Sequence, residues 1–122
     1  MFKVPESLKH VDVMGIQIPV IIDQSRCEHL GALGLFDGEI VLRQEYEDHG
    51  VFMKTLVHEM FHAHCHTIGL QLDIQIEEVL ATTSERLFVS ASQTFADIFA
   101  PMVSDEDGEP VKRGRGRPRK GT

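Results

Sequence analysis

The feature that most restricts the fold is an uninterrupted helical pattern in the middle of the chain. Residues 51–68 contain neither proline nor glycine, and their apolar side chains recur at helical spacing. Acidic residues precede this pattern, where they suit the positive end of the helix dipole, and Gly69 follows it as a C-cap. The sequence therefore predicts a helix from about His49 to Ile68 with one buried face.

This helix carries the run His58-Glu59-Met60-Phe61-His62. Residues four apart lie on one face of a helix, so His58 and His62 can present their imidazoles to one metal ion. Glu59 can accept a proton from a water molecule whose pKa a zinc ion lowers. The motif predicts zinc as the cofactor, His58 and His62 as metal ligands, and Glu59 as the catalytic general base.

Catalytic zinc sites use three protein ligands and leave one position open. His66 extends the series, but it lies about 12 Å along the helix axis from His58. Zinc–nitrogen bonds of about 2 Å cannot reach across that distance. Glu77 and Glu78 follow His62 closely enough for a loop and a returning helix. Glu77 is the predicted third ligand, and Glu78 is the runner-up because a one-residue error in helical phase would exchange them.

The returning helix is predicted over residues 74–99, with Pro101 ending it. Its stripe at helical spacing is expected to face the first helix and consists of Leu80, Ala81, Ser84, Leu87, Phe88, Ala91 and Phe95. Glu77 falls on this stripe, whereas Glu78 groups with Glu85 on a more solvated side. This difference is the reason for preferring Glu77 as the ligand.

β-branched residues dominate residues 11–22, and Met14-Gly15 divides them into two predicted strands. Pro19 in the second of these runs favours an edge position or a bulge, because proline cannot donate to a strand ladder.

Residues 35–43 predict a third strand, entered through a turn at residues 37–38. Alternation places Ile40 and Leu42 on one face of that strand and Val41 on the other. The predicted fold is therefore of the α+β class, with a three-stranded sheet packed on two long helices and a disordered C-terminal tail.

Charge is distributed unevenly along the chain. Six of the twelve Lys and Arg residues lie in residues 112–122, which leaves six against nineteen Asp and Glu in residues 1–111, a net charge of −13. We expect one folded domain over residues 1–102, an acidic linker over residues 103–111 and a basic arm over residues 112–122.

The basic arm resembles an AT-hook over about residues 112–120, through its Arg-Gly-Arg-Pro core. The narrow minor groove of AT-rich DNA attracts arginine, and glycine lets the backbone lie deep within it. The resemblance implies that AT-rich double-stranded DNA binds Arg113, Arg115, Gly116, Arg117, Pro118, Arg119 and Lys120. Arg115 and Arg117 should insert into the groove, while the flanking cations neutralise phosphates. A generic polybasic tail is the alternative interpretation.

The sequence predicts a cytoplasmic protein with no membrane partner. Cys27 and Cys65 belong to no CxxC pair and are predicted to be buried, reduced thiols. The first ten residues lack the apolar core of a signal peptide, and no apolar run approaches the length of a membrane span.

Three segments, LFDGEIVL, TLVHEMFHAH and IEEVLATTSERL, resemble small HExxH proteins of phages and mobile elements, which are similar to ImmA/IrrE-type metallopeptidases. The resemblance covers about residues 11–95. It implies a zincin-like domain in which His58, His62 and Glu77 hold the metal and Glu59 is the base. It also implies that the LFDGEIVL strand borders the cleft, where its edge could bind an extended peptide.

The segment HEMFHA also resembles SprT-like proteases, which act on DNA-bound proteins. Those proteins use a third histidine further along the chain, and no histidine follows His66 here. The only tyrosine, Tyr46, is the candidate for stabilising the transition state.

These features predict a zinc-dependent peptidase that is tethered to AT-rich DNA and acts on DNA-associated proteins, in the cytoplasm or nucleoid of a host cell if its origin is a phage. One alternative is a non-enzymatic DNA-binding module whose zinc only stabilises the fold. Glu59 separates these two hypotheses, because a structural site needs no base. Another alternative is a host-modulating phage inhibitor or adaptor whose acidic body imitates the charge of DNA.

Overall fold

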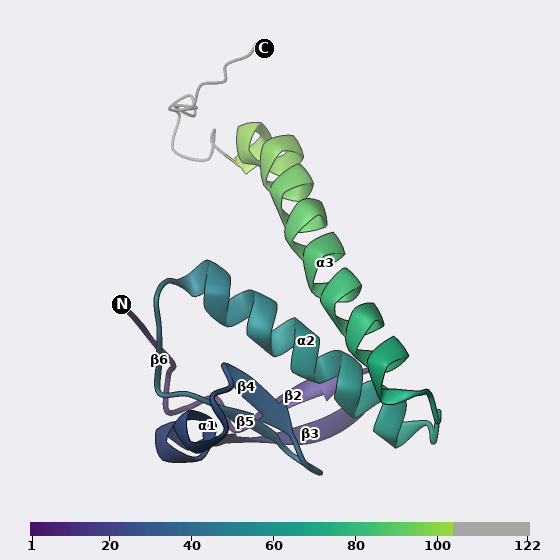
Figure 1. Ribbon diagram of the computed structural model, residues 1–122. Helices are drawn as coiled ribbons and strands as arrows, with labels where there is room; N and C mark the ends of the chain where they lie inside the picture. The colour runs from purple at the N-terminus through teal and green to yellow at the C-terminus, as the bar shows by residue number, and fades with distance from the viewer. Residues whose placement is uncertain (104–122) are drawn as a thin grey trace. The chain divides into compact units, whose positions relative to one another are not determined.

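A computed structural model describes residues 1–103, which form three helices, a four-stranded sheet and a two-stranded sheet (Figure 1). The predicted α+β class is confirmed. The chain divides into two compact units, Met1–Phe88 and the remainder from Val89. All the predicted metal and catalytic residues lie in the first unit. Residues 104–122, which hold most of the predicted acidic linker, the basic arm and the tail predicted to be disordered, lie outside the described residues.

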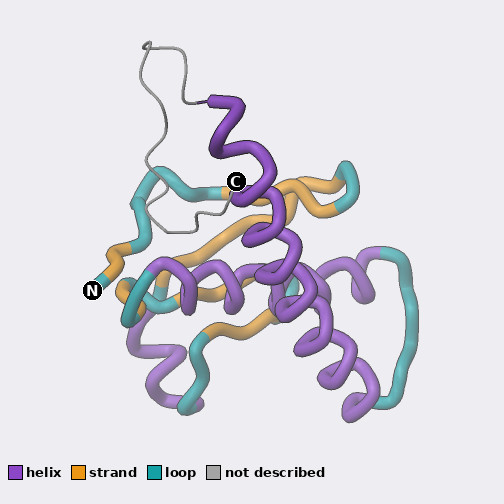
Figure 2. Tube along the Cα trace, turned by 90° about the horizontal axis from the view of Figure 1, so that it is seen from above, coloured by secondary structure: helices purple, strands orange, loops and turns teal. Residues whose placement is uncertain are grey.

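The succession of helices, strands and loops can be followed in Figure 2. The elements are β1 (Phe2–Lys3), β2 (His10–Val13), β3 (Ile16–Ile22), α1 (Gln24–Leu30), β4 (Gly34–Phe36), β5 (Ile40–Leu42), β6 (Glu45–Tyr46), α2 (His49–Thr67) and α3 (Ile74–Val103). The larger sheet has the strand order β2-β3-β5-β4, and β1 pairs with β6. Within residues 1–103, no helix combines the length and apolar character that crossing a membrane requires.

The two strands predicted around Met14-Gly15 are β2 and β3, which pair as an antiparallel hairpin. The φ angles of Met14 and Gly15 are 53° and 90°, and a two-residue type I′ turn needs positive φ at both positions. Pro19 lies in an inner strand rather than the expected edge strand. Pairing of β3 with β5 begins only at Val20, so β2 is the only strand paired with β3 at the proline.

The segment predicted as one strand, residues 35–43, contributes two. β4 and β5 pair antiparallel with Phe36 opposite Ile40, and the chain reverses between them at Gly38, whose φ is 74°. The prediction of a three-stranded sheet is therefore wrong. A left-handed glycine in this segment reverses the chain instead of merely leading into a strand.

β5 is the most buried strand, and Ile40, Val41 and Leu42 have no exposed surface. Ile40 and Leu42 belong to the main apolar core, as their shared face predicted. Val41 is also buried, and the thiol of Cys27 in α1 donates to its carbonyl oxygen at 3.9 Å. The sheet was predicted to pack on two long helices. In the structure the long helix α2 and the short helix α1 pack on β5, so the predicted packing on a second long helix is wrong. Cys27 and Cys65 are both free and buried, as predicted.

Helix α2 packs on the larger sheet, against β4, β5 and β2 (Figure 1). Its N-cap is Asp48, whose carboxylate accepts a hydrogen bond from the backbone N–H of Val51 at 2.9 Å. It ends one residue earlier than predicted, and its C-cap is Ile68 and not the predicted Gly69. Gly69 follows the cap with a left-handed φ of 70°. The apolar residues of α2 that pack with the core are Val51, Phe52, Leu56, Met60 and Ala63.

Helix α3 begins at Ile74, as predicted, but it continues through Pro101 to Val103. The predicted end at Phe99 is wrong. Pro101 lies in the last turn of the helix, and it lacks the N–H that would bond to the preceding turn.

Candidate metal centre and active site

Helix α2 brings its two histidines to one face, as the spacing of the motif predicts. The ring centroids of His58 and His62 lie 5.0 Å apart with an angle of 61° between the planes. Each side chain keeps only 14% of its surface exposed, so the imidazoles are largely shielded from water.

Glu78 of α3 lies between the two imidazoles. Its Oε2 is 2.8 Å from Nε2 of His58, and its Oε1 is 3.1 Å from Nε2 of His62. One ligand atom from each of these three residues lies within 4.8 Å of the others. Two imidazole nitrogens and a carboxylate facing a common point form a group that could hold a metal ion.

The predicted third ligand was Glu77, and the group that the structure brings together contains the runner-up, Glu78, instead. Oε2 of Glu77 contacts Nδ1 of His62 at 2.5 Å, on the outer side of that ring. The group that could hold a metal ion therefore contains the residue after the predicted third ligand.

The physical reason is the orientation of α3 about its own axis. The stripe expected to face α2 is largely exposed, with Leu80 41% and Leu87 65% accessible to solvent. Ala81 is fully buried, and the carboxylates of Glu78 and Glu85 reach the histidines of α2. Ala81 and Glu77 belong to the predicted stripe, so the side of α3 turned toward α2 includes part of that stripe together with Glu78 and Glu85.

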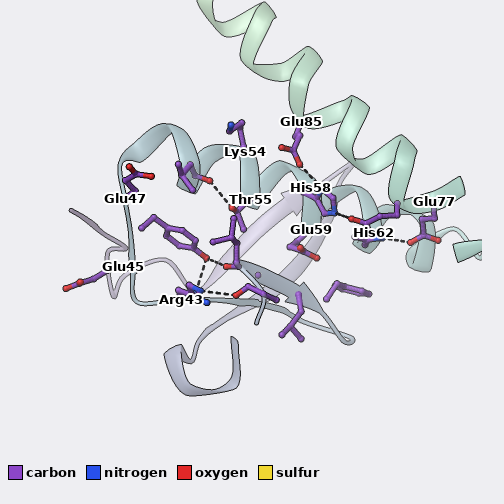
Figure 3. A pocket seen from close by; sticks show the side chains of 18 of the residues that line it. Arg43, Glu45, Glu47, Lys54, Thr55, His58, Glu59, His62, Glu77 and Glu85 are labelled. Carbon is purple, nitrogen blue, oxygen red and sulfur yellow. Dashed lines mark hydrogen bonds and ion pairs between the residues drawn. The ribbon is translucent and has the colours of Figure 1, made fainter. Parts of the chain in front are cut away.

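Glu85 completes the surroundings of the histidines. Its Oε1 lies 2.7 Å from Nδ1 of His58 (Figure 3), so with Glu77 on His62 each imidazole has a carboxylate at both nitrogens. A carboxylate at Nδ1 holds the proton on that nitrogen and leaves Nε2 available to a metal. Sequence reasoning assigned Glu85 no role. The available signal was its spacing of seven residues from Glu78, which places both on one face of α3.

Glu59 lies beside this group and is only 6% exposed. Burial raises the pKa of its carboxyl group, and the neighbouring charges of His58 and His62 only partly oppose that rise. For His62 the balance differs: burial lowers its pKa, but the hydrogen bond to Glu77 and the nearby carboxylates raise it above the usual value. Glu59 forms no side-chain hydrogen bond or ion pair with another residue of 1–103, so its carboxylate is available for proton transfer.

The site opens onto a pocket of ≈ 1100 Å³ (Figure 3). Its lining includes Thr55, His58, Glu59 and His62 of α2, together with all three residues of β4. β4 is an edge strand of the larger sheet. Of the segment that the family resemblance expected at the border of the cleft, residues 35–42, only Leu35 and Phe36 line the pocket.

Gly34 allows β4 to approach α2 closely. A Cβ atom at this position would lie 2.7 Å from Cγ2 of Thr55 and 3.4 Å from Cγ of Glu59. A larger residue would require the side chain of Thr55 or the strand to shift. Neither Gly34 nor Thr55 was predicted to matter to the site.

The surroundings of Tyr46 do not favour the predicted role of stabilising the transition state. Its hydroxyl donates to the carbonyl of Leu33 and accepts from the backbone N–H of Arg43. Burial raises the pKa of Tyr46 to about 12. The hydroxyl is therefore engaged in holding the backbone next to the pocket. His66 packs edge-on against Phe36 with ring centroids 5.4 Å apart, away from the metal-binding group, in accord with its exclusion as a ligand.

Comparison with models of protein families, with curated proteins and with solved structures finds no match to this chain. The geometry of residues 1–88 therefore carries the functional inference. The predicted DNA-binding residues lie outside the described part of the chain; they are Arg113, Arg115, Gly116, Arg117, Pro118, Arg119 and Lys120.

Proposed function

We propose that this protein is a zinc-dependent peptidase in which His58, His62 and Glu78 bind the metal and Glu59 is the general base. One observation carries the proposal: a buried carboxylate with no partner within residues 1–103 lies beside a two-histidine, one-glutamate group, and both line the same pocket. That ligand set leaves room for substrate, as catalytic zinc sites require.

The residues around the proposed metal site would have separate roles in catalysis. A bound zinc ion would polarise a peptide carbonyl and lower the pKa of water. Glu59 would accept the proton of that water and pass it to the leaving amine. Glu77 and Glu85 would hold the histidines in the tautomer that binds metal.

The edge strand β4 supports a peptide as the substrate. One side of β4 pairs with β5, and its other side has no neighbour in the strand order of the larger sheet. Its residues line the pocket together with Glu59 and both histidines. An extended peptide could add to this edge by backbone hydrogen bonds, which would bring its carbonyl groups past the metal.

The same features weigh against the alternative of a purely structural zinc. Structural sites normally have four protein ligands, and the group described here has three. A structural site would also gain nothing from burying the ionisable Glu59 beside it, because burial of an unpaired carboxylate destabilises the fold.

Zinc content and activity test the proposal directly. The purified full chain should hold about one zinc ion, and chelation should abolish cleavage of unstructured peptides. Glu59→Gln should retain zinc and lose activity by about 100-fold to 10,000-fold. Glu47→Gln, which also changes a pocket carboxylate, is the matched control and should remain active. A wild-type protein without zinc, or an active Glu59→Gln, would refute the mechanism.

We further propose that the chain is related to the ImmA/IrrE-type metallopeptidases and acts on DNA-associated proteins, with its basic arm as the tether. The support is the Arg-Gly-Arg-Pro core and the contrast between the arm and a body of net charge −13 in residues 1–111. Replacing Arg115 and Arg117 by alanine should weaken binding to AT-rich duplexes about 10-fold or more at low salt. The double variant Arg26→Ala/Arg86→Ala removes the same charge elsewhere and should bind normally.

A further inference from the structure

The end of the pocket away from Glu77 carries two cations, Arg43 and Lys54. Within residues 1–103 the carboxylates form ion pairs only with Arg26 and with the two histidines of the site. Neither pocket cation is therefore neutralised by a protein carboxylate, although the domain carries a large excess of them.

Arg43 is half-buried and held in one orientation. Its Nε donates to the carbonyl oxygen of Ala32 at 2.9 Å, which fixes the guanidinium head. Its two terminal nitrogens make no hydrogen bond with any other residue of 1–103. A shielded guanidinium with free terminal donors is suited to bind a carboxylate through two parallel hydrogen bonds.

The register of the sheet places Arg43 next to the reactive part of the pocket. It directly follows Leu42, which pairs with Gly34, the first residue of β4. The Cβ position of Gly34 lies 3.4 Å from Cγ of Glu59. A peptide lying along β4 would therefore pass Arg43 within a few residues of the bond beside Glu59.

Lys54 also lines the pocket, from helix α2. It lies four residues before His58 on α2, so its side chain is on the same helical face, about 6 Å along the axis. Glu45 and Glu47 also line the pocket, but neither pairs with Arg43 or Lys54. In Figure 3 both glutamates lie beyond Arg43, on the side away from Glu59.

We propose that Arg43, assisted by Lys54, is a specificity-determining residue that binds a carboxylate of the substrate. The carboxylate can belong to an Asp or Glu side chain near the cleaved bond or to the C-terminus of the peptide. This inference rests on the proposed peptidase function, and it adds that acidic or C-terminal peptide segments are the preferred substrates.

The carboxylate-binding role of Arg43 is tested by comparing cleavage of acidic peptides with cleavage of their amide analogues. The zinc-loaded full chain is given an unstructured peptide mixture, and mass spectrometry identifies the cleaved bonds. Acidic residues should be enriched at one fixed position, or cleavage should occur at a fixed distance from a free C-terminus and be lost on amidation. Arg43→Gln should slow cleavage of the preferred peptides about 10-fold or more. It should leave their Asp-to-Asn or Glu-to-Gln analogues unchanged.

Arg26→Gln is the control, because it removes the same charge outside the pocket and should not alter the preference. If Arg43→Gln fails to fold, the comparison of acidic and amide peptides with wild-type protein still decides. Equal cleavage of the two members of every peptide pair would overturn the inference while leaving the peptidase proposal intact.

Binding separates failure of this inference from failure of the proposed function. Zinc-loaded Glu59→Gln should bind a fluorescent acidic peptide, and adding Arg43→Gln should weaken that binding by about 10-fold. Arg43-dependent binding without any cleavage by wild type would support the carboxylate site and refute the peptidase. Binding of the acidic peptide that is unchanged by Arg43→Gln would refute the carboxylate site.

Discussion

The two ends of the pocket differ in how their polar groups are satisfied. At the metal end, each nitrogen of His58 and His62 contacts a carboxylate, and the protein itself supplies every partner. At the other end, Arg43 and Lys54 have no carboxylate partner within residues 1–103. Under the two proposals made above, the first end would perform the chemistry and the second would select ligands.

This comparison predicts that substitutions at the metal end change metal affinity most. The size of each effect should depend on whether Nε2 or Nδ1 of a histidine loses its carboxylate partner. Glu78→Ala should produce the largest effect, a loss of zinc affinity beyond the ~100-fold typical of outer partners. Titration with a zinc-sensitive dye would measure it. Glu77→Ala is the matched comparison from the neighbouring position. If Glu77→Ala lost more zinc than Glu78→Ala, the assignment of the third ligand would have to be reversed.

The outer carboxylates should have a smaller effect. Glu85→Gln and Glu77→Gln each replace the acceptor at one Nδ1 and should weaken zinc binding about 10-fold to 100-fold. The two variants act on different histidines, so their effects should be comparable. Glu47→Gln lines the same pocket without touching a histidine and should bind zinc normally. Unchanged zinc affinity in both test variants would show that the Nδ1 contacts do not orient the ligands.

The metal end was more predictable than the cationic end because its chemistry imposes spacing. His58 and His62 must be four residues apart on a helix, and that rule is visible in a single segment of sequence. Glu77 and Glu78 both reach His62, at Nδ1 and at Nε2 respectively, so helical phase alone could not decide between them.

The edge of the pocket was predicted only in part, because it depends on a chain reversal and on a close approach between β4 and α2. The left-handed Gly38 splits a segment that reads as one strand, and this reversal creates the edge strand β4. Arg43 enters the pocket through the same pairing, since Leu42 lies opposite Gly34. The reversal did have a local signal, because Asp37-Gly38 between apolar residues is typical of a hairpin turn, but it was interpreted as the entry to a single strand. The pairing of Leu42 with Gly34 has no local signal, because these residues meet only after folding.

The contact between the two walls of the pocket provides a further prediction. Gly34→Ala would place a methyl group 2.7 Å from Cγ2 of Thr55 and should destabilise the protein by about 1–2 kcal/mol. Thr55→Ser removes that methyl group while keeping a hydroxyl to donate to the carbonyl of Val51. The double variant should recover most of the loss, as measured by urea unfolding. Strictly additive effects would mean that Gly34 does not set the spacing between β4 and α2.

The smallest expected effect belongs to Lys54, at the cationic end. Lys54 is exposed, so a charge pair with substrate is screened by water and worth little. Lys54→Gln should slow cleavage of an acidic peptide about two-fold, leave its amide analogue unaffected and leave zinc affinity unchanged. Raising the ionic strength should remove even this difference, whereas the contribution of the half-buried Arg43 should persist. A Lys54→Gln variant that lost zinc would contradict the separation of the two ends, because one turn of α2 would then couple selection to metal binding.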